Sequence, residues 1–184
     1  VGKDGLVTAL DISRPSIEQL STVAASDARL TALVADMSEL RSVVDSQCQT
    51  PRYSFVNSTY SLYYAPDPQD VLQQMVSLLT PAGRVAVAVP VGPHGMVEIA
   101  SKFSEIPNSV LESFEFGPNV LEPAFREFFD NVSVHFFRAD MVIPSIEEFL
   151  KFYQSTTYFS ADAVDDIRNY LDRDVSEEKI NYCL

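Results

Sequence analysis

The stretch that decides the fold is residues 53–90, which read YSFVNSTYSLYYAPDPQDVLQQMVSLLTPAGRVAVAVP. An apolar strand leads into a polar and aromatic loop, a helix begins at the Asp-Pro pair 67–68, and the sequence TPAG at 80–83 turns into a second apolar strand. A strand, a helix and a strand in this order form a βαβ unit, which requires a parallel sheet. Ligands bind such sheets beside the carboxyl ends of the strands, so functional residues are expected there.

The same alternation extends toward the start of the chain. Residues 6–12 (LVTALDI) and 30–35 (LTALVA) are apolar runs of strand length, with a helix capped by Ser13 expected between them and a short helix over 38–44. Nearly continuous apolar strands that alternate with helices predict the α/β class, with a doubly wound, mostly parallel sheet and helices on both faces.

The pattern changes after residue 90. A single strand or a strand pair is expected over residues 132–143, and Ser145 with Glu148 forms a capping box at the start of a helix. Further helices are expected over residues 96–106, 120–129, 162–171 and 176–183. We find no repeat and no low-complexity linker, so residues 1–184 are expected to form a single domain. Residues 91–144 are long enough to form a lid or a wall of a substrate pocket.

Composition excludes several classes of function. The net charge of −13 repels phosphate backbones, so nucleic acid is not an expected partner. No run approaches the roughly 18 apolar residues of a membrane span, and residues 1–11 lack the form of a signal peptide, so a cytoplasmic location without membrane contact is expected. Cys48 and Cys183 share no metal-binding or redox spacing, and no metal is expected.

Several sequence segments together resemble class I methyltransferases that use S-adenosylmethionine and act on small molecules. They are the acidic strand end in LVTALDIS (6–13), the VADM that follows the next strand (34–37), and residues 53–90 with their Leu-Thr-Pro-Ala-Gly-Arg turn. The resemblance covers about residues 5–90. Residues 136–159 resemble a later segment of these enzymes more loosely. The resemblance implies a Rossmann-like fold and methyl transfer to a small-molecule acceptor by in-line displacement.

One departure from the family is large. The glycine-rich loop that follows the family's first strand is absent, since Gly2 and Gly5 are the only glycines before residue 83. By the family's plan, the first strand and this loop would precede Val1. The chain is therefore expected to be an internal portion of a longer protein, with a sheet that lacks its central strand. The alternative is a relative that has lost its cofactor loop.

The resemblance also assigns cofactor-binding residues. Asp11 would accept hydrogen bonds from the ribose hydroxyls, or it could simply cap the following helix. Asp36 would accept the adenine amine while Met37 packs against the ring, or Asp36 could cap the helix near residue 38. Asn57 and Ser58, expected to end their strand, would contact the methionine portion, or could merely terminate the strand. The cofactor-binding set is Asp11, Ile12, Asp36, Met37, Asn57 and Ser58.

Aromatic residues and a histidine are the candidates for the substrate side. Tyr60, Tyr63 and Tyr64 follow the third strand and could line the acceptor pocket and attract the sulfonium by cation–π interaction, or they could be core residues. His94 follows the fourth strand and is the candidate general base, although a single loop histidine can also be an ordinary surface residue. Methyl transfer needs no compact catalytic motif, because the sulfonium is already an activated leaving group.

Two other functions stay open on the sequence. Asp11 at a strand end would suit the ribose of NAD as well, which makes a nicotinamide-dependent oxidoreductase the main rival, although the chain has no Tyr-x-x-x-Lys pair. A non-catalytic methyltransferase-like subunit with a binding or scaffold role would explain the missing glycine loop.

Overall fold

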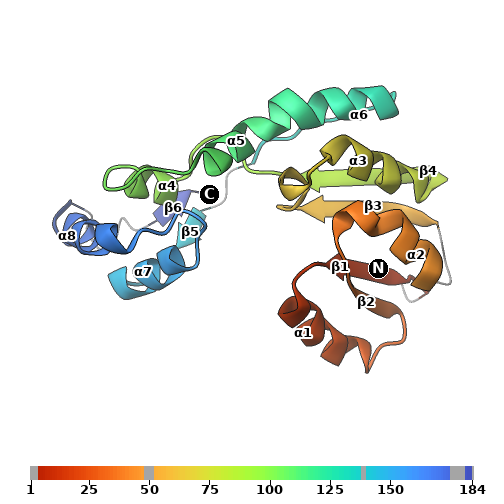
Figure 1. Ribbon diagram of the computed structural model, residues 1–184, viewed down its shortest axis with the longest axis horizontal. Helices are drawn as coiled ribbons and strands as arrows, with labels where there is room; N and C mark the ends of the chain where they lie inside the picture. Colours follow the sequence, from red (N-terminus) through yellow and green to blue (C-terminus); the bar gives the residue numbers. More distant parts are fainter. Residues whose placement is uncertain (1–3, 48–51, 138–139, 175–180, 184) are drawn as a thin grey trace. The chain divides into compact units, whose positions relative to one another are not determined.

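The computed structural model describes residues 4–47, 52–137, 140–174 and 181–183. The chain divides into two compact units, the first comprising Val1–Val89 with Glu127–Asp130 and the second Pro90–Arg126 with Asn131–Leu184 (Figure 1). The boundary falls where the pattern of strands and helices changes in the sequence. The single-domain organisation and the lid role of residues 91–144 stay predictions.

The first unit alternates strands and helices. Its elements are β1 (Val7–Asp11), α1 (Arg14–Ala24), β2 (Leu30–Val34), η1 (Met37–Glu39), α2 (Leu40–Gln47), β3 (Tyr53–Thr59), η2 (Leu62–Tyr64), α3 (Pro68–Ser77) and β4 (Leu79–Ala88). β1 pairs in parallel with β2, from Val7 opposite Leu30 to Asp11 opposite Val34. β3 pairs in parallel with β4 across the α3 crossover, as a βαβ unit requires.

The fold is therefore α/β with parallel strands, but the described residues do not form one doubly wound sheet. In the part of the chain that the structure describes, β1 is hydrogen-bonded to β2 alone and β3 to β4 alone. The sequence pattern predicts each strand and its direction, because both depend on local apolar runs and short crossovers. The joining of strand pairs into a wider sheet depends on contacts between distant segments. The apolar runs of the sequence do not specify these contacts.

The helix starts in this unit follow from their capping residues. The Ser13 hydroxyl accepts a hydrogen bond from the Ser16 amide at 3.4 Å at the start of α1, and Asp67 accepts from the amides of Gln69 and Asp70 at 3.1 and 3.0 Å at the start of α3. A proline occupies the first turn of both helices, where its missing N–H costs nothing. α3 then turns Val71, Leu72 and Met75 into the core, together with Leu62 and Leu78.

The expected TPAG turn lies within the bounds of β4. Opposite β4, the register shifts between Tyr53, which pairs with Leu79, and Phe55, which pairs with Arg84, so residues 80–83 form an irregularity in the strand. A Cβ on Gly83 would stand 2.9 Å from the Leu79 Cβ and 3.0 Å from the Thr80 carbonyl oxygen. The chain folds back on itself too closely at this point for any residue except glycine.

The second unit is mainly helical. Its elements are α4 (Gly95–Ala100), α5 (Asn108–Phe116), the π-helical η3 (Gly117–Leu121), most of α6 (Glu122–Phe128), β5 (Asp140–Val142), α7 (Ile146–Gln154), η4 (Ala161–Ala163), α8 (Val164–Asp174) and β6 (Asn181–Cys183). The end of α6, from Glu127, belongs to the first unit. Its core is one cluster centred on Phe149, Tyr153, Ile167 and Leu171, all at 0% exposure. The Ser145 hydroxyl accepts from the Glu148 amide at 3.2 Å, which confirms the N-cap expected at α7.

Two expectations for this unit are wrong. Of the strand expected over 132–143, residues 138–139 lie outside the described residues and residues 140–142 form β5. Residues 132–137 carry no strand pairing, with Phe136 and Phe137 exposed by 78% and 75%. Alternating apolar residues fit a strand, but a strand also needs a partner edge. Within the helix expected over 176–183, residues 176–180 lie outside the described residues, while residues 181–183 form β6, antiparallel to β5.

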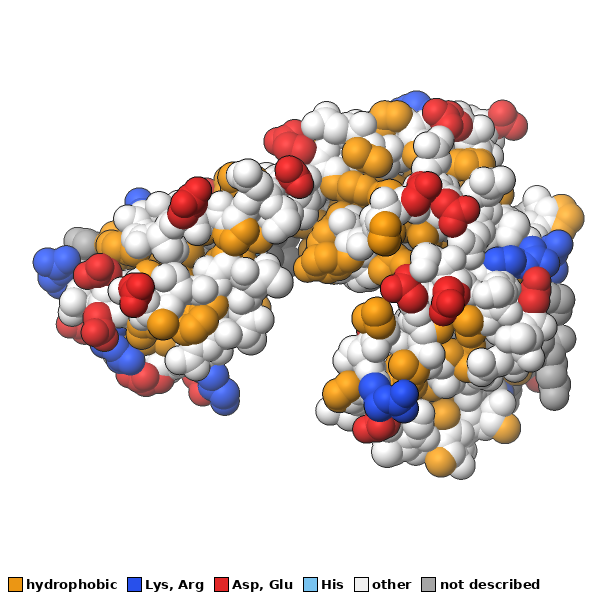
Figure 2. Space-filling view, in the orientation of Figure 1, with side chains coloured by type: hydrophobic (Ala, Val, Ile, Leu, Met, Phe, Trp, Pro, Cys, Tyr) orange, Lys and Arg blue, Asp and Glu red, His pale blue; other side chains and the backbone are white. Residues whose placement is uncertain are grey.

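On the face that Figure 2 shows, acidic and basic side chains are scattered rather than gathered into one patch. No helix in the described part of the chain is long and apolar enough to cross a membrane.

Candidate functional site

The carboxyl edge of the β1–β2 pair brings together two carboxylates. Asp11 is the last residue of β1 and lies opposite Val34 of β2. Its backbone carbonyl accepts a hydrogen bond from the Ala35 amide at 3.2 Å, which places the next residue, Asp36, beside it. The structure thus brings Asp11 and Asp36 to the same end of two adjacent parallel strands, where open α/β sheets bind ligands.

Each carboxylate is held in place through one of its two oxygens. The Asp11 Oδ1 accepts from the Ser13 amide at 2.7 Å, and the Asp36 Oδ1 accepts from the amide and the hydroxyl of Ser38 at 2.8 and 2.7 Å. The Ser38 amide, followed by the Ser38 hydroxyl, lowers the pKa of Asp36, so this group is ionised at neutral pH. Among the described residues, the Oδ2 atom of neither group has a hydrogen-bond partner. Asp36 is thus the N-cap of η1, whereas Asp11 holds the turn before Ser13, the N-cap of α1, and each carboxylate keeps one acceptor oxygen.

Apolar side chains flank the two carboxylates. Ile12 is 70% exposed directly after β1, Val34 at the end of β2 is 41% exposed, and the partly buried Met37 begins η1. A flat apolar ligand with polar groups at its rim would find both kinds of contact at this edge. The structure thus gathers four of the six expected cofactor residues: Asp11, Ile12, Asp36 and Met37.

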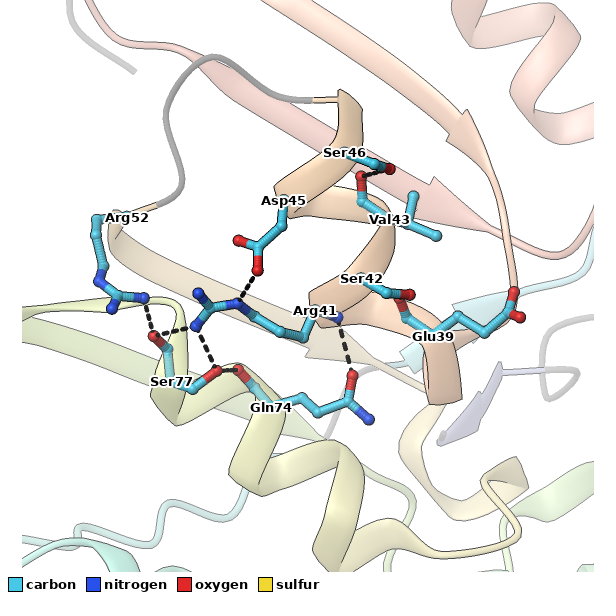
Figure 3. Close-up of polar contacts among 9 residues, drawn as sticks. All are labelled: Glu39, Arg41, Ser42, Val43, Asp45, Ser46, Arg52, Gln74 and Ser77. Atoms are coloured by element: carbon cyan, nitrogen blue, oxygen red, sulfur yellow. Dashed lines mark hydrogen bonds and ion pairs between the residues drawn. The ribbon is translucent and has the colours of Figure 1, made fainter.

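A polar network that the sequence analysis missed holds the turn after β2 (Figure 3). The Gln74 side chain on α3 donates to the Ser38 carbonyl at 2.8 Å and accepts from the Arg41 amide at 2.9 Å. The Arg41 guanidinium pairs with Asp45 at 2.6 Å and donates to the carbonyl and hydroxyl of Ser77, both at 3.1 Å. Gln74 thereby ties α3 to the turn that contains Asp36. A glutamine on the polar side of a helix carries no local sequence signal of such a contact.

Asn57 and Ser58 do not end β3 as expected. The strand continues to Thr59, and Asn57 and Ser58 lie opposite Ala86 and Val87 of β4. The Asn57 side-chain amide donates to the Thr59 hydroxyl at 3.0 Å, and the Ser58 hydroxyl lies 2.7 Å from that of Ser61. Pairing with β4 keeps Asn57 and Ser58 in the strand conformation, although asparagine and serine favour turns. Their role toward a cofactor stays a prediction.

The tyrosines lie in the loop after β3. Tyr60 has a left-handed backbone with φ of 53°, and its amide donates to the Ala88 carbonyl at 2.9 Å. Tyr60 and Tyr64 are exposed by 49% and 64%, whereas Leu62 between them is buried and seats the loop. The ring centroids of Tyr63 and Tyr64 are 4.5 Å apart. Burial raises the pKa of Tyr63. Tyr60 and Tyr64 are therefore not core residues.

His94 belongs to the second unit and occupies the N-cap position of α4. Its Nδ1 atom is buried and has no hydrogen-bond partner among the described residues. The ring centroids of Phe114 and Tyr158 lie 6.0 and 6.3 Å from the centroid of the imidazole ring. Burial lowers the pKa of His94, and Glu98 acts in the opposite direction with a smaller effect. The histidine is thus a neutral imidazole with a buried, unused nitrogen, rather than an ordinary surface residue.

The described residues contain no group of three or more His, Cys, Asp or Glu side chains that could hold a metal ion.

Comparison with known proteins finds a distant likeness among solved structures. No family model matches the chain, and no curated protein matches it. Among solved structures, the chain is similar to the crystal structure of the [4+2]-cyclase SpnF, at 14% identity and a TM-score of 0.47. The match covers 97% of this chain, and the chain spans 64% of the length of that one. At this identity and TM-score the likeness carries no argument about activity.

Proposed function

We propose that the chain binds the adenosine half of S-adenosylmethionine at the β1–β2 edge and takes part in methyl transfer to a small-molecule acceptor. The observation that carries the proposal is the pair of anchored carboxylates, Asp11 and Asp36, at the ends of adjacent parallel strands. Each has one oxygen fixed by the backbone and one without a partner in the described part of the chain.

These two groups fit an adenosine. The Asp11 carboxylate can accept hydrogen bonds from the vicinal ribose hydroxyls, and the Asp36 carboxylate can accept one from the exocyclic amine of adenine. Ile12 and Met37 supply apolar contact for the ring. Fixing each carboxylate through its other oxygen removes much of the entropy that binding would otherwise cost.

The bound cofactor would supply a methyl group that is already attached to a good leaving group. The chain's own residues then need to bind, orient and exclude water. We assign Tyr60, Tyr63 and Tyr64 to the acceptor side, because two of the three rings are exposed just beyond the β3 carboxyl end. His94 belongs to the second unit, and its role as general base for a hydroxyl or amine stays a prediction from the sequence.

An NMR titration with S-adenosylhomocysteine tests the proposal, since it detects weak binding in a chain without the family's glycine-rich loop. We expect saturable shifts of the Ser13, Met37 and Ser38 amides in the wild type. In Asp11→Asn, affinity should fall by roughly 1.5–3 kcal/mol, the range for a hydrogen bond to a charged group. The matched control is Asp27→Asn, which removes another exposed carboxylate that accepts a backbone amide, from Arg29. This control should leave the affinity unchanged.

The two rival functions give different results in the same experiment. Tighter binding of NAD than of S-adenosylhomocysteine would favour the oxidoreductase. An absence of shifts with either ligand would leave Asp11 and Asp36 with the structural role of holding the turns before α1 and η1, and would favour a non-catalytic subunit.

A further inference from the structure

Three tyrosine side chains gather in the loop that follows β3. The ring centroids of Tyr63 and Tyr64 are 4.5 Å apart with their planes at 49°, so the two rings are tilted toward each other rather than stacked. Burial raises the pKa of Tyr63 most, followed by a hydrogen bond with the Tyr64 side chain, and the Tyr60 phenol acts in the same direction. The three phenols therefore lie near one another, with the rings of Tyr60 and Tyr64 exposed by 49% and 64%.

The backbone of Tyr60 has an unfavourable conformation. Its φ of 53° lies in the left-handed region, where a bulky side chain is uncommon. The Tyr60 amide donates to the Ala88 carbonyl at 2.9 Å, which adds one more bond to the pairing of β3 with β4. Glycine or asparagine would adopt this conformation at lower cost. A tyrosine held in this way at the end of a strand indicates a role for its side chain.

The charges next to the tyrosines are acidic. Residues 53–83 contain no lysine, arginine or histidine, and their charged residues are Asp67 and Asp70, at the start of α3. Gln69, which lies between them, donates to the Glu127 carboxylate at 2.8 Å, so a further negative charge lies beside this helix. In a chain with a net charge of −13, these surroundings favour a positively charged ligand over an anionic one.

We propose that the methyl acceptor is an amine, and that Tyr60, Tyr63 and Tyr64 form an aromatic site for its positively charged nitrogen. The inference rests on the proposed function and names the class of its acceptor. Aromatic faces attract ammonium groups, most strongly where water is excluded. In the reaction, the lone pair of a neutral amine forms the new bond to the methyl carbon. The carbon–sulfur bond breaks, its electron pair stays on sulfur, and the positive charge passes to nitrogen. A nitrogen that still carries hydrogen then releases a proton to water.

The surroundings of the tyrosines favour an amine over a hydroxyl acceptor. The nitrogen of an amine gains positive charge as it attacks, and aromatic faces and carboxylates stabilise that charge in the transition state. The oxygen of a hydroxyl must instead lose its proton. Carboxylates nearby disfavour the alkoxide that would form, because like charges repel.

A pair of probes of equal shape tests the site without the cofactor. Choline carries a trimethylammonium group, and 3,3-dimethylbutan-1-ol has a neutral carbon in place of the nitrogen. Both are titrated by NMR into the 184-residue chain at about 0.15 M salt, which screens long-range attraction. We expect choline to bind at least about fivefold more tightly, as two exposed cation–π contacts would give. The ring signals of Tyr60 and Tyr64 should shift.

Variants of the two exposed tyrosines separate the aromatic site from general attraction to an acidic protein. Tyr64→Leu keeps an apolar side chain without the aromatic face and should lose most of the preference for choline. The matched variant Tyr64→Phe keeps the aromatic face and should retain the preference. Equal affinities of the two probes in the wild type would overturn the inference. A preference that survives in both Tyr64→Leu and Tyr60→Leu would also overturn it.

Titration of S-adenosylhomocysteine into the same samples distinguishes failure of this inference from failure of the proposed function. Binding of S-adenosylhomocysteine without a preference for choline would overturn the amine acceptor alone. A preference for choline without binding of S-adenosylhomocysteine would overturn the proposed function, and with it the acceptor role of the tyrosines.

Discussion

At the scale of single residues, position 83 requires glycine because a Cβ would clash there, although the φ angle of Gly83 is not in the left-handed region. A Cβ at this position would meet the Leu79 Cβ and the Thr80 carbonyl at 2.9 and 3.0 Å, and neither a Cβ nor a backbone oxygen can move away cheaply. We expect Gly83→Ala to lower the free energy of unfolding by about 1–3 kcal/mol, the usual cost of overpacking. Urea unfolding measures it. Gly92→Ala is an informative comparison, since a Cβ there meets no atom within 4 Å although its φ is +70°. Equal stability of Gly83→Ala and wild type would contradict the packing argument.

His94 should make stability depend on pH. Burial lowers its pKa below the ordinary value of 6.5, so the unfolded chain binds more protons than the folded chain as the pH falls through this range. The stabilising effect of the neutral imidazole is complete above about pH 6.5 and is lost as the pH falls below it. The melting temperature of the wild type should therefore drop between pH 7.5 and pH 5.5.

The variant His94→Phe should lose most of this pH dependence, because phenylalanine fits beside Phe114 and Tyr158 and does not titrate. His135→Gln changes the other histidine of the chain, which is exposed, and should keep the dependence. If the melting temperature of His94→Phe still falls with pH as in the wild type, the pH dependence arises from other groups.

At the scale of elements, α3 positions the turn that carries Asp36. Gln74 reaches from α3 to the Ser38 carbonyl and the Arg41 amide, so it ties two helices to the end of β2. Gln74→Met keeps the length of the side chain and removes these two hydrogen bonds and a third one, which the side chain donates to the Asp70 carboxylate at 2.7 Å. We expect it to lower stability by about 0.5–1.5 kcal/mol for each bond lost. In the NMR titration, Gln74→Met should weaken S-adenosylhomocysteine binding although the variant still carries the Asp11 carboxylate.

Gln69→Met is the matched control for this variant, since Gln69 also lies on α3 but bonds to Glu127 instead. Its affinity for S-adenosylhomocysteine should stay that of the wild type. Loss of affinity in both variants would show that α3 acts through overall stability rather than through the turn.

Most of the first unit could be predicted from sequence because its elements depend on local signals. Ser13 caps the helix that it was expected to cap, α3 begins at the Asp-Pro pair as expected, and the two parallel pairs follow from short crossovers. The errors fall where tertiary pairing decides. β3 extends through Asn57 and Ser58 because these residues pair with β4. Residues 181–183 form a strand because they pair with β5. The site carboxylates are visible in sequence as strand ends, whereas Gln74 acts across helices and gives no such signal.

At the scale of the whole molecule, each unit has its own core. Phe149 is fully buried within the second unit, and Leu72 is fully buried within the first. We expect Phe149→Ala to cost about 3–5 kcal/mol and Leu72→Ala about 2–5 kcal/mol. Hydrogen exchange by residue should show that each variant loses protection mainly in its own unit. Equal loss of protection across both units in both variants would mean that the chain unfolds as a single domain.

The central claim is that the Asp11 carboxylate binds a ribose diol at the β1–β2 edge. The most direct measurement compares adenosine with 2′,3′-dideoxyadenosine, titrated by NMR into the wild type and into Asp11→Asn, as a double-mutant cycle. We predict that the wild type prefers adenosine by about tenfold or more, the value of a hydrogen bond to a charged group. The variant should bind both nucleosides equally. Equal affinities in the wild type, or a preference that persists in Asp11→Asn, would contradict the claim.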